Sequence, residues 1–432
     1  MLRRIQHYYR TFRDVAELQG WREATRRSAS FLLRRLGGRF SLHRAGRPRK
    51  FPQVVARNIA IVNTLPPALN SRGLVLIISD IQIRQCVHYR INQKIRYLDS
   101  IGIKAQHVLP QDIGRIRSLL GLCHTIVIYR TRMNAAFIQE LRDAGCRVVF
   151  ECDDLIIGAE VVRNSGILRE ISDHMASGLC NLADGLQDTA LLCDEIIVST
   201  DYLAWIYGKP GASLSHLPIH VLPNFLEADC TAMAQEPRYT FAYTSPSGSI
   251  RTELQMLGDF LRNHDETCQR PWSILVMGNH LVSRELEEIG FKNGRVETAP
   301  FSEYDSYIEQ ISHAACVLIP LAASGFNSAK TPIRLMDAAL AGTQVLFSPV
   351  GANADIARTL PASLMPVEDE DWAGIGRYAE SVIAARGQNV KNLQRAVNLL
   401  YGPDAARRSY ADLFADQLAI APTAQQAELE LT

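Results

Sequence analysis

The sequence has no apolar run long enough to cross a membrane. A membrane-spanning helix needs about 20 predominantly apolar residues, and no stretch of 18 occurs in this chain of 432 residues. The first residues also lack the apolar segment of a secretory signal peptide. We therefore expect a cytoplasmic protein. Peripheral attachment to the inner face of a membrane is the one membrane association left open.

Cysteine is present, but not in the patterns that crosslink chains or bind zinc. The nine cysteines are an odd number, and no two have the C-x-x-C spacing. This distribution excludes a complete disulfide framework and does not indicate a zinc site. We expect free thiols in a reducing compartment and no metal site.

Net charge is nearly absent, yet it is unevenly distributed. Residues 1–50 hold 14 Arg and Lys against three acidic residues, a balance of +11. Because the whole chain carries +1, the remaining residues carry −10. Aromatic and aliphatic side chains alternate with the arginines of this segment, as in helices that lie on anionic bilayers. A solvated helix or an arm packed on a partner subunit is the alternative.

Basic charge is confined to that arm, so nucleic acid is not an expected partner. Residues 51–72 have little regular pattern and are interpreted as a linker. From residue 73 to 227, short apolar segments alternate with helical patterns, which predicts a parallel sheet with helices on both faces. The strands are expected at 74–79, 105–109, 125–130, 147–151, 195–199 and 219–222, and the helices at 86–100, 111–122, 134–144, 166–192 and 200–207.

A second alternation follows, after a linker predicted at 228–238, and forms a second domain over 239–402. Its strands are expected at 239–244, 273–278, 295–299, 316–321 and 344–348, with a short one near 364–367. Its helices are expected at 250–264, 281–289, 303–313, 332–341 and 352–358, and helices continue to about residue 418. The fold class is therefore α/β, with two doubly wound, Rossmann-like domains.

Residues 316–355 carry the clearest functional pattern. A buried strand ends at Leu321, and Thr331-Pro332 begins a helix after a loop. Ligands of doubly wound sheets bind at such strand ends, and a helix N-terminus favours phosphate. Lys330 and Arg334 add positive charge, and the Asp337 carboxylate is expected to accept hydrogen bonds from a ribose. The alternative is a packing helix with Arg334–Asp337 as a surface ion pair.

This segment resembles the donor-binding half of GT-B glycosyltransferases, in particular those of bacterial polysaccharide synthesis. The match comprises Pro320-Leu321, Phe326-Asn327, residues 330–337 (KTPIRLMD), Ala341-Gly342 and Val350-Gly351. Retaining members often carry two glutamates eight positions apart on this helix. Here Asp337 stands at the second position and Ala329 at the first, so the sequence departs from that pattern.

The resemblance spans residues 74–405 and implies a hexosyltransferase that is retaining and metal-independent. Its second domain would bind a nucleotide-sugar, which is a substrate, so no cofactor is expected. Its first domain, across a cleft, would bind a glycan or lipid-linked glycan acceptor in surface polysaccharide synthesis. Residues 403–432 would return to the first domain. Two alternatives are a catalytically silent GT-B scaffold, which Ala329 favours, and a sugar-nucleotide epimerase.

Further donor-site candidates follow from strand ends and from the same resemblance. They are Ser247, Gly248, Gly278, Phe301, Gly325, Phe326 and Asn327, together with Lys330, Thr331, Arg334 and Asp337.

Three first-domain residues are the candidate catalytic groups. Arg90 follows the first strand and is expected to hold a phosphate or an acceptor carboxylate, unless it is only an exposed residue of a helix start. Asp153 and Asp154 close the fourth strand. A carboxylate there would act as a base or stabilise an oxocarbenium-like state, whereas a structural role would be to cap the next segment.

Overall fold

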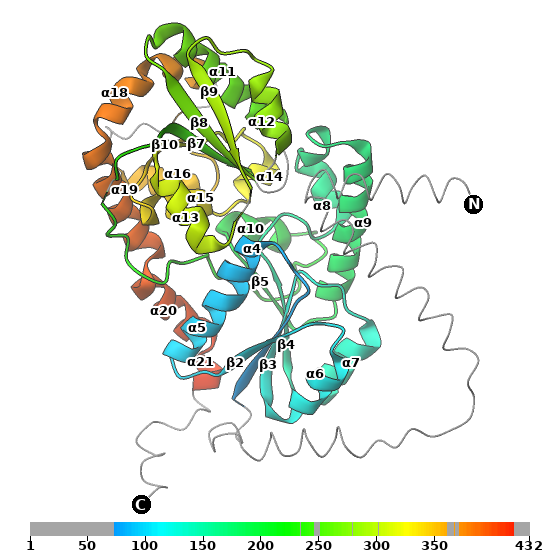
Figure 1. Ribbon diagram of the computed structural model, residues 1–432. Helices are drawn as coiled ribbons and strands as arrows, with labels where there is room; N and C mark the ends of the chain where they lie inside the picture. Colours follow the sequence, from blue (N-terminus) through cyan, green and yellow to red (C-terminus); the bar gives the residue numbers. More distant parts are fainter. Residues whose placement is uncertain are drawn as a thin grey trace, which may run out of the picture.

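The computed structural model describes residues 73–418 except Ala234, 246–250, Asn279, Phe301, 361–366 and 368–370. These residues form two parallel β-sheets, each covered by helices on both faces (Figure 1). No helix in this described part is long and apolar enough to span a membrane. The basic arm at 1–50, the linker at 51–72 and the end of the chain after 418 lie outside it.

The first sheet has the strand order β2-β1-β3-β4-β5-β6, and every neighbouring pair is parallel. All five residues of β1 are buried, as expected for a parallel strand covered on both faces. The strands are β1 Leu74–Ile78, β2 Ala105–Val108, β3 Cys123–Tyr129, β4 Arg147–Cys152, β5 Glu195–Val198 and β6 Ile219–Val221.

Alternate residues of β1 face different layers of helices. Leu74 and Leu76 pack in a core with α6, α7, α9 and α10, whereas Val75 and Ile77 pack in a core with α5 and with α20 (Pro403–Leu413) (Figure 1). The helices before the second domain are α4 Arg84–Cys86, α5 Gln93–Ser100, α6 Ile113–Leu119, α7 Ala135–Asp143, α8 Ala159–Asn164, α9 Asp173–Ala190 and α10 Asp201–Gly208. A π-helical turn, Val87–Asn92, joins α4 to α5.

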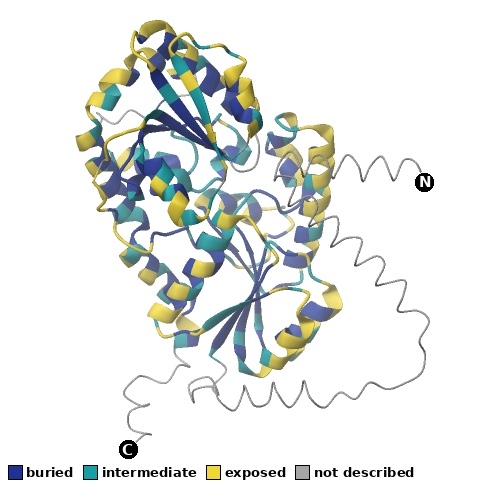
Figure 2. Cartoon of the chain, viewed as in Figure 1, coloured by how far each residue is buried: buried dark blue, intermediate teal, exposed yellow. Residues whose placement is uncertain are grey.

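The second sheet has the order β11-β10-β7-β8-β9 and is also fully parallel. Its strands are β7 Tyr239–Ser245, β8 Trp272–Gly278, β9 Gly294–Ala299, β10 Ala314–Ile319 and β11 Gln344–Phe347. Figure 2 shows both sheets as the buried centres of the molecule. Helices α13, α15 and α19 cover one face of this sheet, and α11, α12 and α17 cover the other.

The second-domain helices are α11 Arg251–Thr267, α12 His280–Glu287, α13 Tyr304–Ser312, α14 Gly325–Ser328, α15 Ile333–Leu340, α16 Asn353–Thr359, α17 Trp372–Ile375, α18 Ala379–Ala384 and α19 Arg386–Tyr401. The last helices, α20 Pro403–Leu413 and α21 Ala415–Leu418, lie against the first sheet, where the Tyr410 ring stacks on Tyr97 at 5.3 Å. The chain therefore returns to its first domain.

The strands predicted from 74 to 348 are confirmed, and most helices fall where the periodicity places them. Two predictions were wrong in detail. The helix expected at 166–192 is divided into a short 3-10 helix, Ile167–Arg169, and α9, which begins only at Asp173 after the capping residue Ser172. The loop expected at 322–330 contains the short helix α14. The strand near 364–367 lies largely outside the described residues.

Strand order decides which loops meet. In each sheet the chain moves outward from its first strand and then returns to the other side of it, between β1 and β3 and between β7 and β10. Ligands of doubly wound sheets bind beyond the strand ends at such a reversal. The loop after β10 lies against segments that follow β4 and β5, so these loops meet between the two domains.

Candidate functional site

The loop after β10 is anchored to the first domain by polar contacts. They are the bonds from Phe326 N to Ser165 O at 3.1 Å, from Thr200 Oγ1 to Ala329 O at 3.3 Å and from Asn224 Nδ2 to Thr331 Oγ1 at 3.1 Å. At the neighbouring edge, Thr252 of α11 donates to the carboxylate of Glu170 at 2.8 Å. The second-domain residues proposed for the donor are thereby held against the first domain.

Ala329 occupies the position where retaining relatives carry their first acid, and it is fully buried in a core cluster of the first domain. Its methyl group contributes to the interface instead of facing an open site. A carboxylate here would be desolvated among apolar side chains, which is costly without a partner. The absence of an acid at this position therefore agrees with the packing of the interface.

Lys330 and Arg334 supply positive charge beside the start of α15. The Lys330 ammonium lies 3.4 Å from Glu253 Oε1 and 5.3 Å from the centre of the Phe326 ring. Burial lowers the pKa of Lys330, and Glu253 partly opposes that shift. Arg334 makes no ion pair with any residue that the structure describes. No side chain caps α15, so its first N–H groups and the Arg334 guanidinium remain for an anion.

Asp337 does not lie where the sequence suggested. Its side chain is completely buried, and its Oδ1 accepts hydrogen bonds from Tyr89 at 2.5 Å and from Tyr304 at 2.8 Å. Burial raises the pKa of Asp337 to about 6, and the tyrosine hydroxyls oppose that rise. The expected ribose contact is therefore corrected: the hydroxyls of Tyr89, Tyr304 and Tyr307 occupy the carboxylate. The alternative of a surface Arg334–Asp337 pair is also wrong.

Tyr89 comes from the first domain but packs in a core cluster of the second. Its hydroxyl lies 2.9 Å from that of Tyr304, and the His88 ring stacks on Tyr304 with 3.6 Å between centroids. Burial lowers the pKa of His88 to about 4, so this imidazole is neutral at physiological pH. The π-helical turn thus delivers two aromatic side chains to the second domain.

Arg90 is corrected from a candidate catalytic group to a structural one. Only 2% of its side chain is exposed, and its Nε donates to Glu151 Oε1 at 2.7 Å. Its Nη1 donates to the Leu222 carbonyl at 2.8 Å and to Asn224 Oδ1 at 3.2 Å. These partners leave the guanidinium no access to substrate. The alternative of an exposed helix start is equally wrong.

Glu151 is shared with a second buried cation, Lys94, which bonds to its other oxygen. Burial lowers the pKa of Lys94 to about 8, although the glutamate opposes that shift. The removal of one member would leave an uncompensated buried charge, which is strongly destabilising. We interpret this group as the polar link between α5, the π-helical turn and β4.

Asp153 and Asp154 lie at the end of β4, beside Arg130. Asp153 Oδ1 accepts from Tyr129 Oη at 2.9 Å and from Arg130 Nη1 at 3.2 Å, while Asp154 Oδ2 lies 3.6 Å from the same nitrogen. Arg130 has a positive φ of 49°, a conformation that is uncommon for a residue other than glycine. This bend follows the last residue of β3 and holds the guanidinium against both carboxylates.

The two carboxylates differ in availability. The Asp153 side chain is 10% exposed and that of Asp154 is 32% exposed. Burial acts to raise the pKa of Asp153, but Arg130, Arg90 and the Tyr129 hydroxyl together lower it. Burial and the neighbouring Asp153 raise the pKa of Asp154, against the influence of Arg130 and Lys330. Asp154 is therefore the more accessible and more basic group.

The remaining donor-site candidates fall into four groups. Gly325 and Phe326 lie on α14 at the domain interface, and Thr331 accepts the bond from Asn224. Asn327 is corrected, because its side chain is 1% exposed and donates to the Ala322 carbonyl at 2.8 Å. Gly278 ends β8 with a φ of 111°, at the edge where ligands bind. Ser247, Gly248 and Phe301 lie outside the described residues.

Close packing against α14, in the loop after β10, explains the glycine at position 351. A Cβ at this position would lie 2.6 Å from the Ser328 carbonyl oxygen, and φ is 59°. A larger residue would push α14 away from the segment after β11. The Val350-Gly351 pair of the resemblance is thus explained by close backbone packing.

Sequence reasoning missed two contributors, Tyr89 and Glu253. Tyr89 directly precedes the candidate residue Arg90, but nothing in the local sequence indicates that its side chain packs in the second domain. Glu253 stands in the first turn of α11 and is buried beside Lys330. The only sequence signal was an acid in the first turn of a predicted helix, where exposed acids are common.

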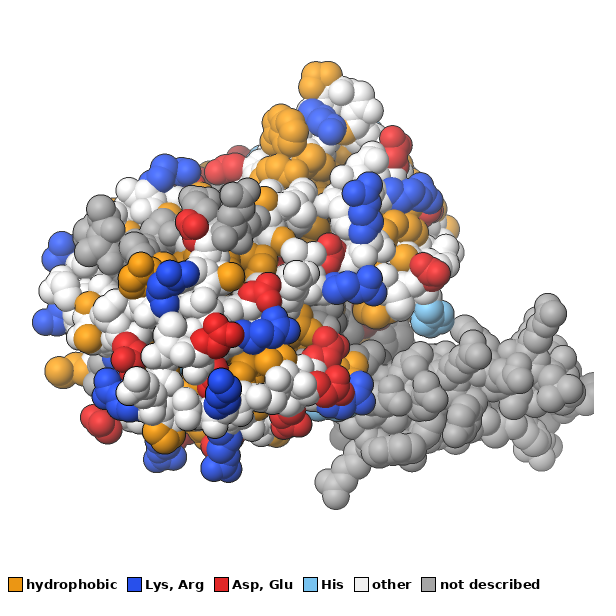
Figure 3. Space-filling model, turned by 90° about the horizontal axis from the view of Figure 1, so that it is seen from above, with side chains coloured by type: hydrophobic (Ala, Val, Ile, Leu, Met, Phe, Trp, Pro, Cys, Tyr) orange, Lys and Arg blue, Asp and Glu red, His pale blue; other side chains and the backbone are white. Residues whose placement is uncertain are grey.

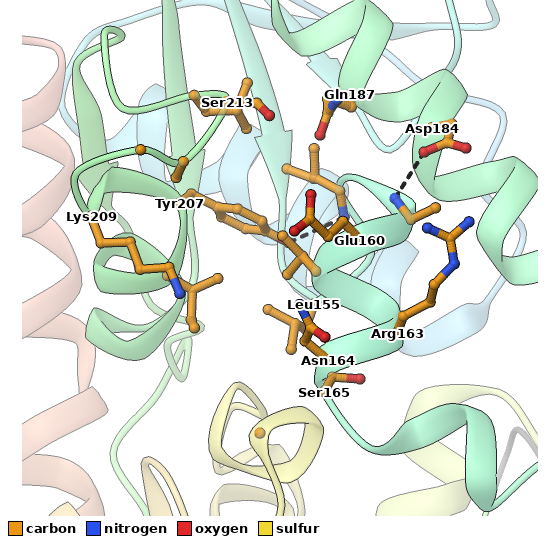
Figure 4. Close-up of a pocket in the computed structure, with 18 of the residues that line it drawn as sticks. Leu155, Glu160, Arg163, Asn164, Ser165, Asp184, Gln187, Tyr207, Lys209 and Ser213 are labelled. Atoms are coloured by element: carbon orange, nitrogen blue, oxygen red, sulfur yellow. Dashed lines mark hydrogen bonds between the residues drawn. The ribbon is translucent and has the colours of Figure 1, made fainter.

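A cavity of about 440 Å³ opens in the first domain beside this site. Residues from the segment after β4, from α8, α9 and α10 and from the loop after α10 form its wall, and Gly325 of the second domain completes it (Figure 4). Elsewhere on the molecule, Figure 3 shows acidic and basic side chains interspersed over the face that it presents. That face has no continuous area of one charge among its described residues.

Comparison with solved structures identifies the fold. The chain is similar to a glycosyltransferase from Rickettsia africae, with a TM-score of 0.53 and 8% identity, over 80% of this chain and 99% of that one. It is also similar to Anabaena HepE, crystallised with UDP, with a TM-score of 0.51 and 11% identity, over 80% and 100%. These similarities and the two parallel sheets confirm the GT-B fold of glycosyltransferases.

Some of the other matches are longer proteins: this chain spans 55% of Staphylococcus aureus TarM, with a TM-score of 0.46 and 9% identity over 67% of this chain. No protein-family model and no curated protein sequence matches the chain.

Proposed function

We propose that this protein is a glycosyltransferase that moves a hexose from a nucleotide-sugar to a glycan or lipid-linked glycan. One observation carries the proposal: Lys330 of the cationic segment that includes Arg334 lies close enough to Asp154 of the first domain for each charge to influence the pKa of the other group. Departure of a nucleoside diphosphate develops negative charge, and deprotonation of an acceptor needs a base.

The roles divide between the domains. Arg334, Lys330 and the uncapped start of α15 would bind the diphosphate and stabilise the charge that grows on it. These cations supply the charge that a metal ion supplies in other transferases, which is why we propose metal-independent chemistry. Asp154 would act on the sugar or the acceptor hydroxyl. The resemblance of residues 316–355 supports a retaining outcome, and the HepE complex makes UDP the first nucleotide to test.

The cellular role is a further part of the proposal. Surface polysaccharide synthesis supplies glycan and lipid-linked acceptors on the cytoplasmic side of a membrane. The balance of +11 in residues 1–50 supports attachment of the enzyme to an anionic bilayer there.

A thermal-shift screen tests the donor assignment. A ligand that binds only the folded state raises the unfolding temperature, so wild-type protein is heated with nucleoside diphosphates and their sugars. We expect one nucleotide series to stabilise the wild type and to stabilise Arg334→Ala much less. The control, Arg358→Ala, removes an exposed arginine elsewhere. If no nucleotide diphosphate stabilises the wild type, the proposal is wrong.

A catalytically silent GT-B scaffold is the second candidate, and the burial of Ala329 at the first acid position favours it. A scaffold would bind the nucleotide-sugar without cleaving it. The test uses the nucleotide-sugar that stabilises the protein in the thermal-shift screen and measures release of nucleoside diphosphate with and without added acceptors. Release indicates a transferase, whereas binding without release indicates a scaffold. The same reaction without an acceptor, followed by product analysis, would reveal an epimerase.

A further inference from the structure

A segment of the first domain, residues 165–171, lies against two helices of the second domain. The Ser165 carbonyl accepts the 3.1 Å hydrogen bond from the Phe326 amide of α14. The Phe326 side chain also packs beside Ile167 in a small cluster of apolar residues. Near the other end of the segment, the Glu170 carboxylate accepts hydrogen bonds from the first turn of α11. We call residues 165–171 the bridging segment.

Glu170 holds the start of α11 through both oxygens of its carboxylate. Its Oε2 accepts from the Thr252 backbone N–H at 3.0 Å, and the Thr252 hydroxyl lies 2.8 Å from Oε1 and 2.9 Å from Oε2. The first N–H groups of a helix have no partner within the helix, and a negative charge beside them is favourable. Glu170 therefore stabilises the first turn of α11 from the other domain.

The residue after Thr252 connects this turn to the proposed donor site. Glu253 is buried, and its Oε1 lies 3.4 Å from the Lys330 ammonium. The same ammonium lies 5.3 Å from the centre of the Phe326 ring. The bridging segment thus contacts both parts of the second domain that hold Lys330. It fixes the turn that carries Glu253, and it packs against Phe326.

We propose that Glu170 is a positioning residue that holds the Lys330 ammonium in place from across the domain interface. Its importance for catalysis rests on the proposed function, in which Lys330 binds the donor diphosphate. A lysine ammonium is carried on a flexible stem, so it needs fixed partners to remain in one position. A charge that is already in place stabilises a departing diphosphate without reorganisation. Lys330 would therefore be set for reaction only while the two domains are in contact.

Chemical labelling tests the position of Lys330 in the absence of nucleotide. Reductive methylation is followed by mass spectrometry, which gives the reaction rate of each lysine in the wild type and in Glu170→Ala. We expect Lys330 to react about fivefold faster in Glu170→Ala, because loss of a group that caps a helix start lets the first turn of α11 open. Lys391, exposed on α19, is the internal reference.

Two further variants separate the positioning role from a loss of charge. Glu170→Gln keeps an oxygen that accepts from Thr252, so it should restore most of the protection of Lys330. Asp188→Ala removes an exposed acid of α9 and should leave the rate at Lys330 unchanged. Equal rates at Lys330 in the wild type and Glu170→Ala would overturn the inference. An equal increase at Lys391 would also overturn it, since it would show a general loss of structure.

A double-mutant cycle connects this position to nucleotide binding. Isothermal titration calorimetry measures UDP affinity for Glu170→Ala in the wild-type and Lys330→Met backgrounds. We expect an affinity loss of about fivefold in the first and of less than about twofold in the second, because Glu170 acts through the lysine that is missing there. An equal loss in both backgrounds, or tighter binding of UDP by Glu170→Ala, would overturn the inference.

The two measurements also distinguish this inference from the proposed function. If the wild type binds no nucleoside diphosphate but Lys330 still reacts faster in Glu170→Ala, the donor assignment fails and the positioning of Lys330 is upheld. If the wild type binds UDP and both measurements show no effect of Glu170→Ala on Lys330, the donor assignment is upheld and the positioning role is rejected.

Discussion

The hydroxyl of Tyr89 donates a 2.5 Å hydrogen bond to Asp337 Oδ1, across 248 positions of the chain. The donor belongs to the π-helical turn of the first domain and the acceptor to α15 of the second. Because Asp337 is fully buried, this bond is shielded from water and contributes to the contact between domains. The same helix carries Arg334, so the contact also positions the cationic segment.

Removal of the Tyr89 hydroxyl should destabilise the protein. Tyr89→Phe keeps the ring in its core but removes one donor from a buried carboxylate, which costs about 1–3 kcal/mol. The expected result is a lower midpoint of urea unfolding. Tyr378→Phe serves as the control, since that ring is 55% exposed. If both variants unfold at the same urea concentration, the bond contributes nothing measurable.

The raised pKa of Asp337 predicts a pH dependence of stability. Because burial raises it from an ordinary value near 3.8 to about 6, the folded state binds the proton more tightly than the unfolded state. This contribution is fully present below about pH 4 and is lost as the pH rises through about 6. Relative to Asp337→Asn, the wild-type free energy of unfolding should fall by about 2–3 kcal/mol between pH 4 and pH 7.

Urea unfolding of both proteins at each pH measures this difference. The comparison with Asp337→Asn is necessary because the pKa of His88 is lowered to about 4, so that residue shifts stability in the opposite direction. A constant difference between the two proteins over this range would contradict the assignment.

The cations beside α15 should matter for diphosphate binding. Arg334→Ala should weaken nucleoside diphosphate affinity about 10- to 150-fold, the equivalent of a charged hydrogen bond of about 1.5–3 kcal/mol. Lys330→Met should weaken it too, but this variant should also lose stability because Glu253 is left buried without its cation. Isothermal titration calorimetry, with Arg358→Ala as the control, measures the affinities. Unchanged affinity in both variants would reject the donor site.

The first-domain carboxylates should affect turnover more than donor affinity. Asp154→Asn should lower the transfer rate roughly 100-fold or more, the scale of a lost acid–base group. Asp153→Asn should also lower the unfolding temperature, since Tyr129 and Arg130 lose their charged partner. Asp404→Asn, 83% exposed on α20, is the control. Rates, nucleotide affinities and melting temperatures are compared; normal rates in both active-site variants would assign catalysis elsewhere.

The basic arm should bind anionic lipid. A chain that begins at Phe51 lacks the +11 balance of residues 1–50 and should no longer co-sediment with phosphatidylglycerol vesicles. Binding of the full chain should weaken as salt is raised, because salt screens the attraction. If both chains sediment equally in low salt, the arm serves a protein contact instead.

The sequence by itself determined the order of strands and helices. Apolar segments of strand length alternate with amphipathic stretches. These patterns involve only residues that are close in the sequence, so they can be read without knowledge of the tertiary structure. It also located the strand, loop and helix of residues 316–355, because the Thr331-Pro332 start and the Gly342 end are local signals. At Gly342 the structure shows a positive φ of 66° and a close approach to the Ala232 carbonyl.

Only the tertiary structure decided which charged and polar groups are available. In the sequence, Arg90, Asp153 and Asp337 all lie near strand ends or helix starts, where ligands bind. The type of a side chain does not show whether its partner is a ligand or another residue of the protein. Arg90 is paired with Glu151, 61 positions away, and Asp337 with Tyr89. Such pairs form because folding brings distant segments into one low-dielectric space, where a buried polar group must find a partner. Because this requirement is met by residues far apart in the sequence, it produces no periodicity or characteristic spacing from which the pairs could be predicted.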